Sequence, residues 1–370
     1  MNVLLLSSRF PWPPFTGDRL RATIWLAALE RDANVTLISP GGSVPAGAPR
    51  FRFEPLQRSF VRGAALGLAL PRRGAASALF ASAYDWQSAI ARAEEKSGGF
   101  DATVVLLSRL DPAVRAHLPR GLHVLDAIDP LRLSIAERAR QASPPLRPLW
   151  RIEERRIARA EADAAGFYDR VLVVSPDECD DLDATAIGNG VDLRPLDEAP
   201  RKFDFGFWGC LPYFGNADAV EWLLREIWPA IRAARPDATL LIAGARASRR
   251  LLAMHGGDGI SVESPVPDIA AAARQIRVAL FPVRYGTGQM NKVLEAAEAG
   301  CALVATPHAL RGLAPLAAHA SLATDAHALA RLAVEAVSNR TAGRVLRAVV
   351  ERTYSRAETL ADLAAVVAAR

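Results

Sequence analysis

Short apolar runs alternate with longer stretches of helical periodicity along the whole chain. In the first half, strands are expected at residues 2–8, 34–40, 102–108, 123–129 and 170–176. In the second half, they are expected at residues 203–209, 238–244, 259–264, 277–283 and 301–307. Apolar strands separated by helical segments are typical of parallel sheets with helices on both faces. The pattern therefore predicts an α/β protein with two Rossmann-like, doubly wound parallel sheets.

The periodicity lapses over residues 187–202, "IGNGVDLRPLDEAPRK", where glycine, proline and charged residues gather. Such a composition is typical of a linker between domains. We expect an N-terminal domain at residues 1–190, a linker at 191–202 and a C-terminal domain at 203–350. Residues 351–370 carry the pattern of an amphipathic helix and are expected to pack back on the N-terminal domain.

Composition narrows the class of protein only modestly. The chain has 370 residues, 51% of them hydrophobic, and a net charge of +5, which suits an anionic small molecule, an anionic bilayer or a nucleic acid. The three cysteines are far apart without metal-ligand spacing, so neither a disulfide framework nor a zinc site is expected. The first residues, "MNVLLLSSRFPWPP", lack the features of a secretory signal, and no apolar run is long enough to span a bilayer. A cytoplasmic location is the resulting expectation.

Candidate chemistry lies in the run "RYGTGQMNKVLEAAEAGCALVATP", residues 284–307, which joins a glycine turn, a lysine and a helix after a predicted strand. In a parallel sheet such a turn lies where ligands bind, and the N–H groups at the start of the helix favour an anion. Gly286 and Gly288 allow the backbone to come close to a phosphate. Lys292 is one of only three lysines among 45 basic residues, so its place here is unusual for this chain.

Two more charged side chains extend this candidate site. Arg284 precedes the turn, and Glu295 follows Lys292 by three residues, which places Lys292 and Glu295 on one helical face. The two cations suit a nucleoside diphosphate, and the carboxylate suits two ribose hydroxyls. In the alternative interpretation the glycines only form a tight turn, and Lys292 and Glu295 form a surface pair.

Two other nucleotide-binding motifs fit less well. A dinucleotide fingerprint would place glycine where the chain has Asn291, and a Walker lysine would be followed by Ser or Thr, whereas Val293 follows Lys292. No metal-binding motif appears in the sequence. Neither a metal nor another cofactor is therefore expected.

The run "GTGQMNKVLEAAEAGCALVATPHALRGL" resembles the donor-binding segment of retaining GT-B glycosyltransferases of the family 4 type. Residues 207–244 resemble the first strand and helix of the C-terminal domain in that family, and "IGNGVD" resembles an element at the domain junction. The run "SRFPWPPFTGDRLR" is similar to the glycine loop after the first strand. "LDAIDPLRL" and "WRIEERRIARAEADAAGFYDRVLVVSPDE" are similar to a bacterial subgroup associated with exopolysaccharide assembly.

The resemblance implies a role for each candidate residue. For donor binding the implied residues are Gly286, Thr287, Gly288, Asn291, Lys292 and Glu295. Lys292 and Arg284 would hold the diphosphate, and Glu295 would hold the ribose. Gly17 would lie near the donor phosphates or the acceptor, and with Lys292 and Arg284 it makes up the implied catalytic group.

The chain departs from the family pattern at two places. Thr287 stands eight residues before Glu295, where the family has a second glutamate assigned to the donor sugar. Cys210 and Phe214 lie about where many members carry an arginine and a lysine. Neutralisation of the diphosphate would then rest more heavily on Arg284 and Lys292.

The resemblance implies transfer of a glycosyl group from a UDP- or GDP-linked sugar to a saccharide or lipid-linked acceptor, with retention at the anomeric carbon. The implied setting is polysaccharide or glycolipid assembly, and no nucleic acid partner is expected. Two alternatives remain open. One is a non-hydrolysing sugar-nucleotide epimerase of the same fold, and the other is a catalytically silent subunit that binds a nucleotide sugar.

Acceptor contacts are expected from the N-terminal half. Asp126 and Asp129 flank a predicted strand end and could reach an acceptor, or Asp129 could cap the helix that follows Pro130. No histidine is assigned to catalysis, because Ser108 and Arg109 stand where many relatives have one.

A membrane contact is suggested by residues 57–73, "QRSFVRGAALGLALPRR", which place arginines around an apolar centre. Such a segment could lie on the inner face of the cytoplasmic membrane and meet a lipid-linked acceptor. A core helix with charged ends is the alternative interpretation.

Overall fold

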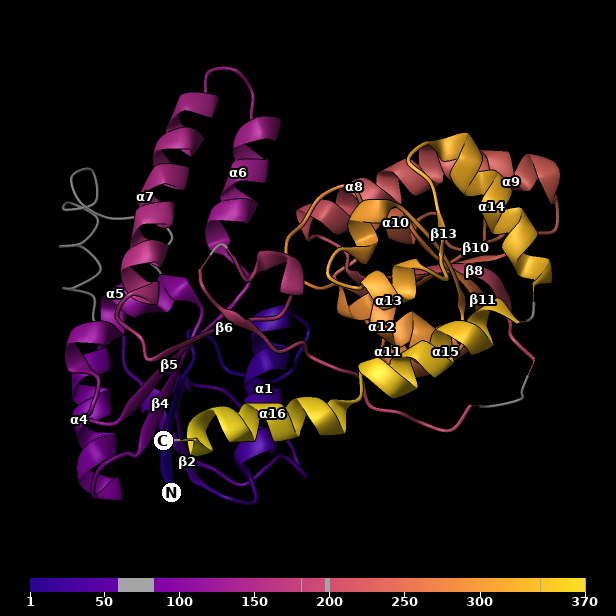
Figure 1. The fold of residues 1–370 in the computed structure, drawn as a ribbon. Coiled ribbons are helices and arrows are strands. Elements are labelled where there is room, and N and C mark those ends of the chain that lie inside the picture. Colours follow the sequence, from indigo (N-terminus) through magenta and orange to yellow (C-terminus); the bar gives the residue numbers. More distant parts are fainter. Residues whose placement is uncertain (59–82, 181, 197–199, 340, 370) are drawn as a thin grey trace. The chain divides into compact units, whose positions relative to one another are not determined.

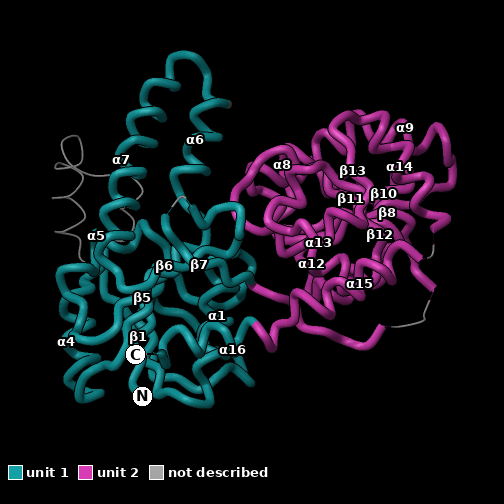
Figure 2. Tube along the Cα trace, viewed as in Figure 1, with its two compact units in different colours: residues 1–188, 359–370 teal, residues 189–358 magenta. Residues whose placement is uncertain are grey.

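The computed structural model describes residues 1–58, 83–180, 182–196, 200–339 and 341–369. The chain divides into two compact units (Figure 2): unit 1 is Met1–Gly188 with Thr359–Arg370, and unit 2 is Asn189–Glu358. Most of the arginine-rich segment at residues 57–73 lies outside the described residues. None of the described helices combines the length and the apolar character needed to cross a membrane.

Unit 1 is built on a parallel sheet with the described strand order β3-β2-β1-β4-β5-β6-β7 (Figure 1). Its strands are β1 (Asn2–Leu6), β2 (Asn34–Pro40), β3 (Arg52–Leu56), β4 (Ala102–Leu106), β5 (Leu122–Ile128), β6 (Arg170–Val173) and β7 (Thr185–Ala186). Successive side chains of a strand point to opposite faces. Leu4 and Leu6 therefore join one hydrophobic cluster, while Val3 and Leu5 join another.

Helices cover both faces of this sheet. The cluster around Leu4 and Leu6 receives side chains from α4 (Trp86–Ser97), α5 (Asp111–Val114) and the end of α7 (Arg147–Ala165). The opposite cluster receives α1 (Gly17–Leu29) and α16 (Arg356–Ala368), so that Leu363 shares a core with Trp25. In addition, α6 (Leu131–Gln141) and α7 run side by side away from the sheet (Figure 1).

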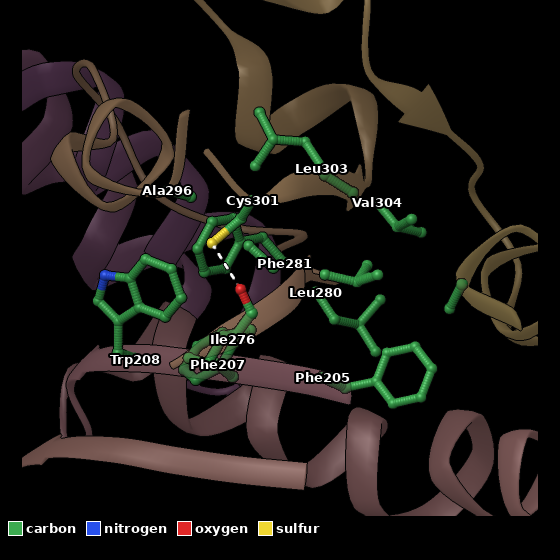
Figure 3. Close-up of a cluster of buried hydrophobic side chains, with 14 of the residues drawn as sticks. Phe205, Phe207, Trp208, Ile276, Leu280, Phe281, Ala296, Cys301, Leu303 and Val304 are labelled. Atoms are coloured by element: carbon green, nitrogen blue, oxygen red, sulfur yellow. Dashed lines mark hydrogen bonds between the residues drawn. The ribbon is translucent and has the colours of Figure 1, made fainter. Parts of the chain in front are cut away.

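Unit 2 is built on a second parallel sheet with the described order β10-β9-β8-β11-β12-β13. Its strands are β8 (Phe203–Cys210), β9 (Leu240–Ala245), β10 (Ile260–Glu263), β11 (Ile276–Phe281), β12 (Ala302–Ala305) and β13 (Ser321–Leu322). Its helices are α8 (Phe214–Trp222), α9 (Trp228–Ala234), α10 (Arg249–Leu252), α11 (Ile269–Arg274), α12 (Asn291–Glu298), α13 (Ala314–Ala317), α14 (Ala326–Ser338) and α15 (Ala342–Thr353). One aromatic-rich core joins the sheet to these helices, with Phe205, Phe207, Trp208 and Phe281 among its members (Figure 3).

The two parallel sheets confirm the predicted fold class. Each of the ten predicted strands is present and begins within two residues of its predicted start. The pattern missed β3, β7 and β13, which lie at the edges of their sheets in the described residues. Edge strands are short and bury less surface, so they leave a weaker apolar signal.

A buried ion pair fixes α1 to β5. The Nε of Arg21 lies 2.6 Å from Oδ2 of Asp126, and neither side chain has exposed surface. The Nε1 of Trp25 donates to the same carboxylate oxygen at 2.6 Å, and Arg21 also donates to the carbonyl of Gly188 at 3.1 Å. Asp126 is therefore part of the core of unit 1, and the expectation that it reaches an acceptor is wrong.

Removing this carboxylate should destabilise unit 1. We expect Asp126→Ala to lower the free energy of unfolding by about 3–5 kcal/mol, because Arg21 would stay buried without its partner. Hydrogen exchange of the β1 and β5 amides measures this loss. Arg92→Ala, at an exposed arginine whose partner Glu54 keeps its bond to Lys96, is the control and should cost at most about 1 kcal/mol. Equal losses from the two variants would contradict the assignment.

Candidate functional site

The loop between β11 and α12 has a backbone shape that requires glycine at two positions. Gly286 has φ of +128° and Gly288 has φ of +71°, where side-chain-bearing residues are disfavoured. The Nε2 of His308, from the segment after β12, lies 2.9 Å from the carbonyl oxygen of Gly286. The loop is thus held in place at the carboxyl end of the sheet, where parallel sheets bind ligands.

Lys292, in the first turn of α12, reaches back over aromatic rings of the sheet. Its Nζ lies 4.5 Å from the ring centroid of Phe207 and 5.6 Å from that of Phe281, within the range of cation–π attraction. It also donates to Oδ1 of Asn216. The Nδ2 of Asn216 donates to the carbonyl of Cys210 at 2.9 Å, which fixes the amide atom that faces the lysine.

These neighbours leave the ammonium without a paired carboxylate in the described residues. Burial lowers the pKa of Lys292 to about 7, and the nearby charge of Glu295 only partly opposes this shift. Near neutral pH the lysine is therefore poised between its two protonation states. An anionic ligand would favour the charged form and would supply the missing countercharge.

Glu295 lies one turn further along α12. Its Oε2 accepts a hydrogen bond from Nε1 of Trp208 at 2.8 Å. Burial raises the pKa of Glu295, while the bond from Trp208 and the charge of Lys292 act in the opposite direction. The indole thus sets the direction of the carboxylate. Lys292 and Glu295 are brought together as the sequence predicted, but each is held by a partner from β8 or α8.

Arg284 is paired within the protein. Its guanidinium makes two bonds to Asp218 of α8, of 2.7 Å from Nη2 and 3.0 Å from Nε. The same group stacks over the ring of Trp222 at 4.5 Å. The bond to Asp218 raises the pKa of Arg284. A diphosphate at the glycine loop would therefore have to share Arg284 with Asp218.

The far end of α12 is anchored by Glu298, which is 2% exposed. One of its carboxylate oxygens, Oε1, lies 2.6 Å from Nη2 of Arg274 and 2.9 Å from Nη1 of Arg347. The backbone N–H of Arg194 donates to this same oxygen at 2.9 Å. One carboxylate therefore joins α12 to α11, to α15 and to the segment before β8.

Cations also occupy the carboxyl end of α12. The Nη2 of Arg201 donates to the carbonyls of Ala299 at 2.7 Å and Gly300 at 3.1 Å. Arg347 donates to the carbonyl of Glu298. Positive charge at this end offsets the negative end of the helix dipole. The opposite end, which carries Lys292, keeps its partial positive charge.

The remaining candidates lie in different surroundings. Asn291 accepts a bond from Nδ2 of Asn189 at 3.0 Å within unit 2. Gly17 is the exposed first residue of α1 in unit 1, and no atom lies within 4 Å of the position where a Cβ would be. Next to it, Asp18 lies 3.2 Å from Nη1 of Arg9 and 3.5 Å from Nη2 of Arg109. Gly17 thus lies beside a charged cluster at the carboxyl end of the unit 1 sheet.

Sequence reasoning missed Trp208, Asn216, His308 and Glu298. A signal was available for Asn216, because it lies in the first turn of the helix after a parallel strand, as Lys292 does. Trp208 lies within β8, two residues before the strand ends at Cys210, so the sequence marks it only as a strand residue near the carboxyl edge of the sheet. The ion pairs of Glu298 have no local signal, because their partners are distant in the sequence.

Comparisons with known proteins agree with this geometry. Residues 202–339 match the family model described as glycosyl transferases group 1. A search among curated proteins finds no match. The matched residues make up most of unit 2.

Solved structures extend the likeness to the whole chain. The sucrose-phosphate synthase of Thermosynechococcus elongatus aligns with a TM-score of 0.72 and 16% identity, over 99% of this chain and 98% of that chain. WaaG, a glycosyltransferase involved in lipopolysaccharide biosynthesis, aligns with a TM-score of 0.66 and 14% identity, over 100% of both chains. Anabaena Alr3699/HepE, in complex with UDP and glucose, aligns with a TM-score of 0.68 and 12% identity, over 100% of both chains. The chain has the two-domain GT-B fold.

Loss of the Glu298 carboxylate should loosen α12. We expect Glu298→Ala to lower the free energy of unfolding of unit 2 by about 3–5 kcal/mol, because Arg274 and Arg347 would lose their buried partner. Hydrogen exchange of the α12 and β11 amides measures the change. The control is Glu335→Ala, at an exposed pair with Arg331, which should cost at most about 0.5 kcal/mol. A loss at Glu298 as small as that of the control would rule out the anchoring role.

Proposed function

We propose that the chain is a retaining glycosyltransferase that moves a sugar from a nucleotide-diphosphate sugar to an acceptor hydroxyl. The observation that carries the proposal is the position of Lys292 and Glu295, one turn apart in α12, directly after the glycine loop at the end of β11. The family match over residues 202–339 supports glycosyl transfer. A structure of the same fold was obtained with UDP and glucose, which supports a nucleotide sugar as the donor.

The difficult step is departure of the nucleoside diphosphate. As the bond between the anomeric carbon and the leaving phosphate oxygen breaks, negative charge grows on that phosphate. Lys292, with backbone N–H groups of the loop at Gly286 and Gly288, stabilises this charge most strongly in the transition state. The acceptor oxygen forms the new bond on the same face of the sugar, and its proton passes to the leaving phosphate. No protein nucleophile is needed in this scheme.

The nucleoside is positioned by the rest of α12. The Glu295 carboxylate accepts hydrogen bonds from the ribose hydroxyls. Trp208 is a positioning residue, because its indole N–H donates to Oε2 of Glu295. Thr287 and Asn291 lie beside the diphosphate and the donor sugar. Arg284 shares its charge between Asp218 and the phosphates. These roles require no metal.

The acceptor belongs to unit 1 in this proposal. Gly17 leaves open space at the start of α1, next to the charged cluster of Arg9, Asp18 and Arg109. A saccharide or a lipid-linked saccharide is the proposed acceptor, in polysaccharide or glycolipid assembly at the inner face of the cytoplasmic membrane. The involvement of WaaG, which has the same fold, in lipopolysaccharide biosynthesis supports this setting.

Calorimetric titration with UDP, GDP and inorganic diphosphate tests the donor site. We expect Lys292→Met to weaken binding of the preferred nucleotide and of inorganic diphosphate by about 10-fold to 100-fold, as is typical for loss of a charged hydrogen bond. Glu295→Gln should weaken binding of the nucleotide alone, because inorganic diphosphate has no ribose. Lys202→Met, at an exposed lysine of unit 2, is the matched control.

The outcomes separate the alternatives. Unchanged binding in Lys292→Met would overturn the site. Binding without sugar transfer to any acceptor would favour the silent subunit, and conversion of the donor to its epimer would favour the epimerase. For a transferase, proton NMR of the product should show the anomeric configuration of the donor.

Proton linkage provides a further test of Lys292. Because burial lowers its pKa to about 7, the lysine is mostly neutral at pH 8, where a terminal phosphate of pKa about 6 is already ionised. A bound diphosphate favours the ammonium, so binding at pH 8 should take up close to one proton and weaken as the pH rises further. Calorimetry in buffers of different ionisation enthalpy measures the number of protons taken up on binding. Lys292→Met should abolish the uptake, and uptake that persists in this variant would assign it to another group.

A further inference from the structure

The pair formed by α6 and α7 is held together by a small core of its own. Ile135 and Ile157 are buried between the helices, with Leu131 and Trp150 packed against them. At the base of the pair, Glu161 accepts the backbone N–H of Leu131 at 2.7 Å. Figure 1 shows both helices extending beyond the sheet of unit 1. The outer side of α7 is therefore an exposed face of a folded element.

Arginines form a regular row along α7. Arg147, Arg151, Arg155 and Arg159 follow one another at intervals of four residues, and all four are exposed. Residues four apart are neighbours on a helix surface, so the row extends over about 18 Å and turns by roughly a third of a circle around α7. The acidic residues in this part of α7 are half-buried or buried, and the first exposed carboxylate in the helix is Asp163. The row thus has a strong local positive charge.

Large apolar side chains are exposed beside the row. Leu146, Leu149 and Ile152 are 50%, 64% and 48% exposed. Between α6 and α7, near the same end, a hollow of about 400 Å³ is lined by Arg140, Arg147 and Arg151 together with the carboxylate residue Glu154. Exposed aliphatic groups and the beginning of the arginine row therefore lie within one end of the helix pair.

We propose that this face of α7 docks on an anionic lipid bilayer. The arginines bind lipid phosphate groups, to which guanidinium donates paired hydrogen bonds. Leu149 and Ile152 enter the boundary of the acyl chains, where their exposed apolar area leaves water. A nucleic acid backbone would satisfy the arginines but would leave these aliphatic groups in water, so the bilayer accounts for more of the observations. The inference does not depend on nucleotide binding in unit 2.

Vesicle binding of the full chain tests the proposal. We expect the protein to bind vesicles of phosphatidylcholine mixed with phosphatidylglycerol and to dissociate from them as the salt concentration rises. It should not bind vesicles of phosphatidylcholine alone. Arg151→Glu with Arg159→Glu should reduce the partition coefficient by about tenfold or more. Leu149→Ser with Ile152→Ser keeps the charge and should reduce it by at least about threefold.

The matched control is Arg344→Glu with Arg352→Glu on α15, two exposed arginines with the same spacing of eight residues. This variant should bind vesicles within about twofold of the wild type. Circular dichroism checks that each variant is folded. Nucleotide binding of Arg151→Glu with Arg159→Glu should equal that of the wild type, which separates failure of this inference from failure of the donor site.

Three results would overturn the proposal. In the first, the wild type does not bind anionic vesicles. In the second, the α15 control loses as much binding as the α7 variant, so that net charge alone explains the effect. In the third, the chain binds a nucleic acid oligomer through the arginine row, and the Leu149 and Ile152 changes have no effect on vesicle binding.

Discussion

The geometry of the candidate site in unit 2 depends on one buried carboxylate. One carboxylate oxygen of Glu298 forms ion pairs with Arg274 and Arg347. The same oxygen accepts a hydrogen bond from the backbone N–H of Arg194. Because α12 has only eight residues, an anchor at its carboxyl end also determines where Lys292 and Glu295 lie at the other. Removing a buried charge partner is costly, so the anchor is stiff as well as specific. Lys292 is thereby held at a defined position over its aromatic rings and beside the glycine loop. A surface helix without such an anchor would position the lysine less precisely.

The central part of the fold could be predicted from the sequence because buried parallel strands are continuous apolar runs. The runs at β1, β4 and β11 are of this kind, and each has the predicted start to within two residues. β3 contains Pro55 and lies at an edge, where a missing N–H is tolerated, so its sequence does not look like a strand. β7 and β13 have two residues each, too few for any periodicity.

The candidate site could be predicted only as far as its chemistry is local. Lys292 and Glu295 share one helix turn with the glycine loop, so their spacing is visible in the sequence. Their partners Asn216 and Trp208 are 76 and 87 residues away, and Asp218 is 66 residues from Arg284. These contacts exist because β8 pairs with β11. The hydrophobic pattern of the sequence does not determine the order of strands in a sheet. Local spacing thus identifies the candidate groups, while topology determines which partners hold each of them.

The place of α16 in unit 1 has a consequence for biosynthesis. Its residues Leu363, Val366 and Val367 belong to the same core as Val3, Leu5 and Trp25. A chain is made from its N-terminus and its domains tend to fold in that order. Here the apolar surface that α16 covers stays open to water until α16 has left the ribosome. Unit 1 begins to be synthesised first, but it is completed only after all of unit 2 has been made.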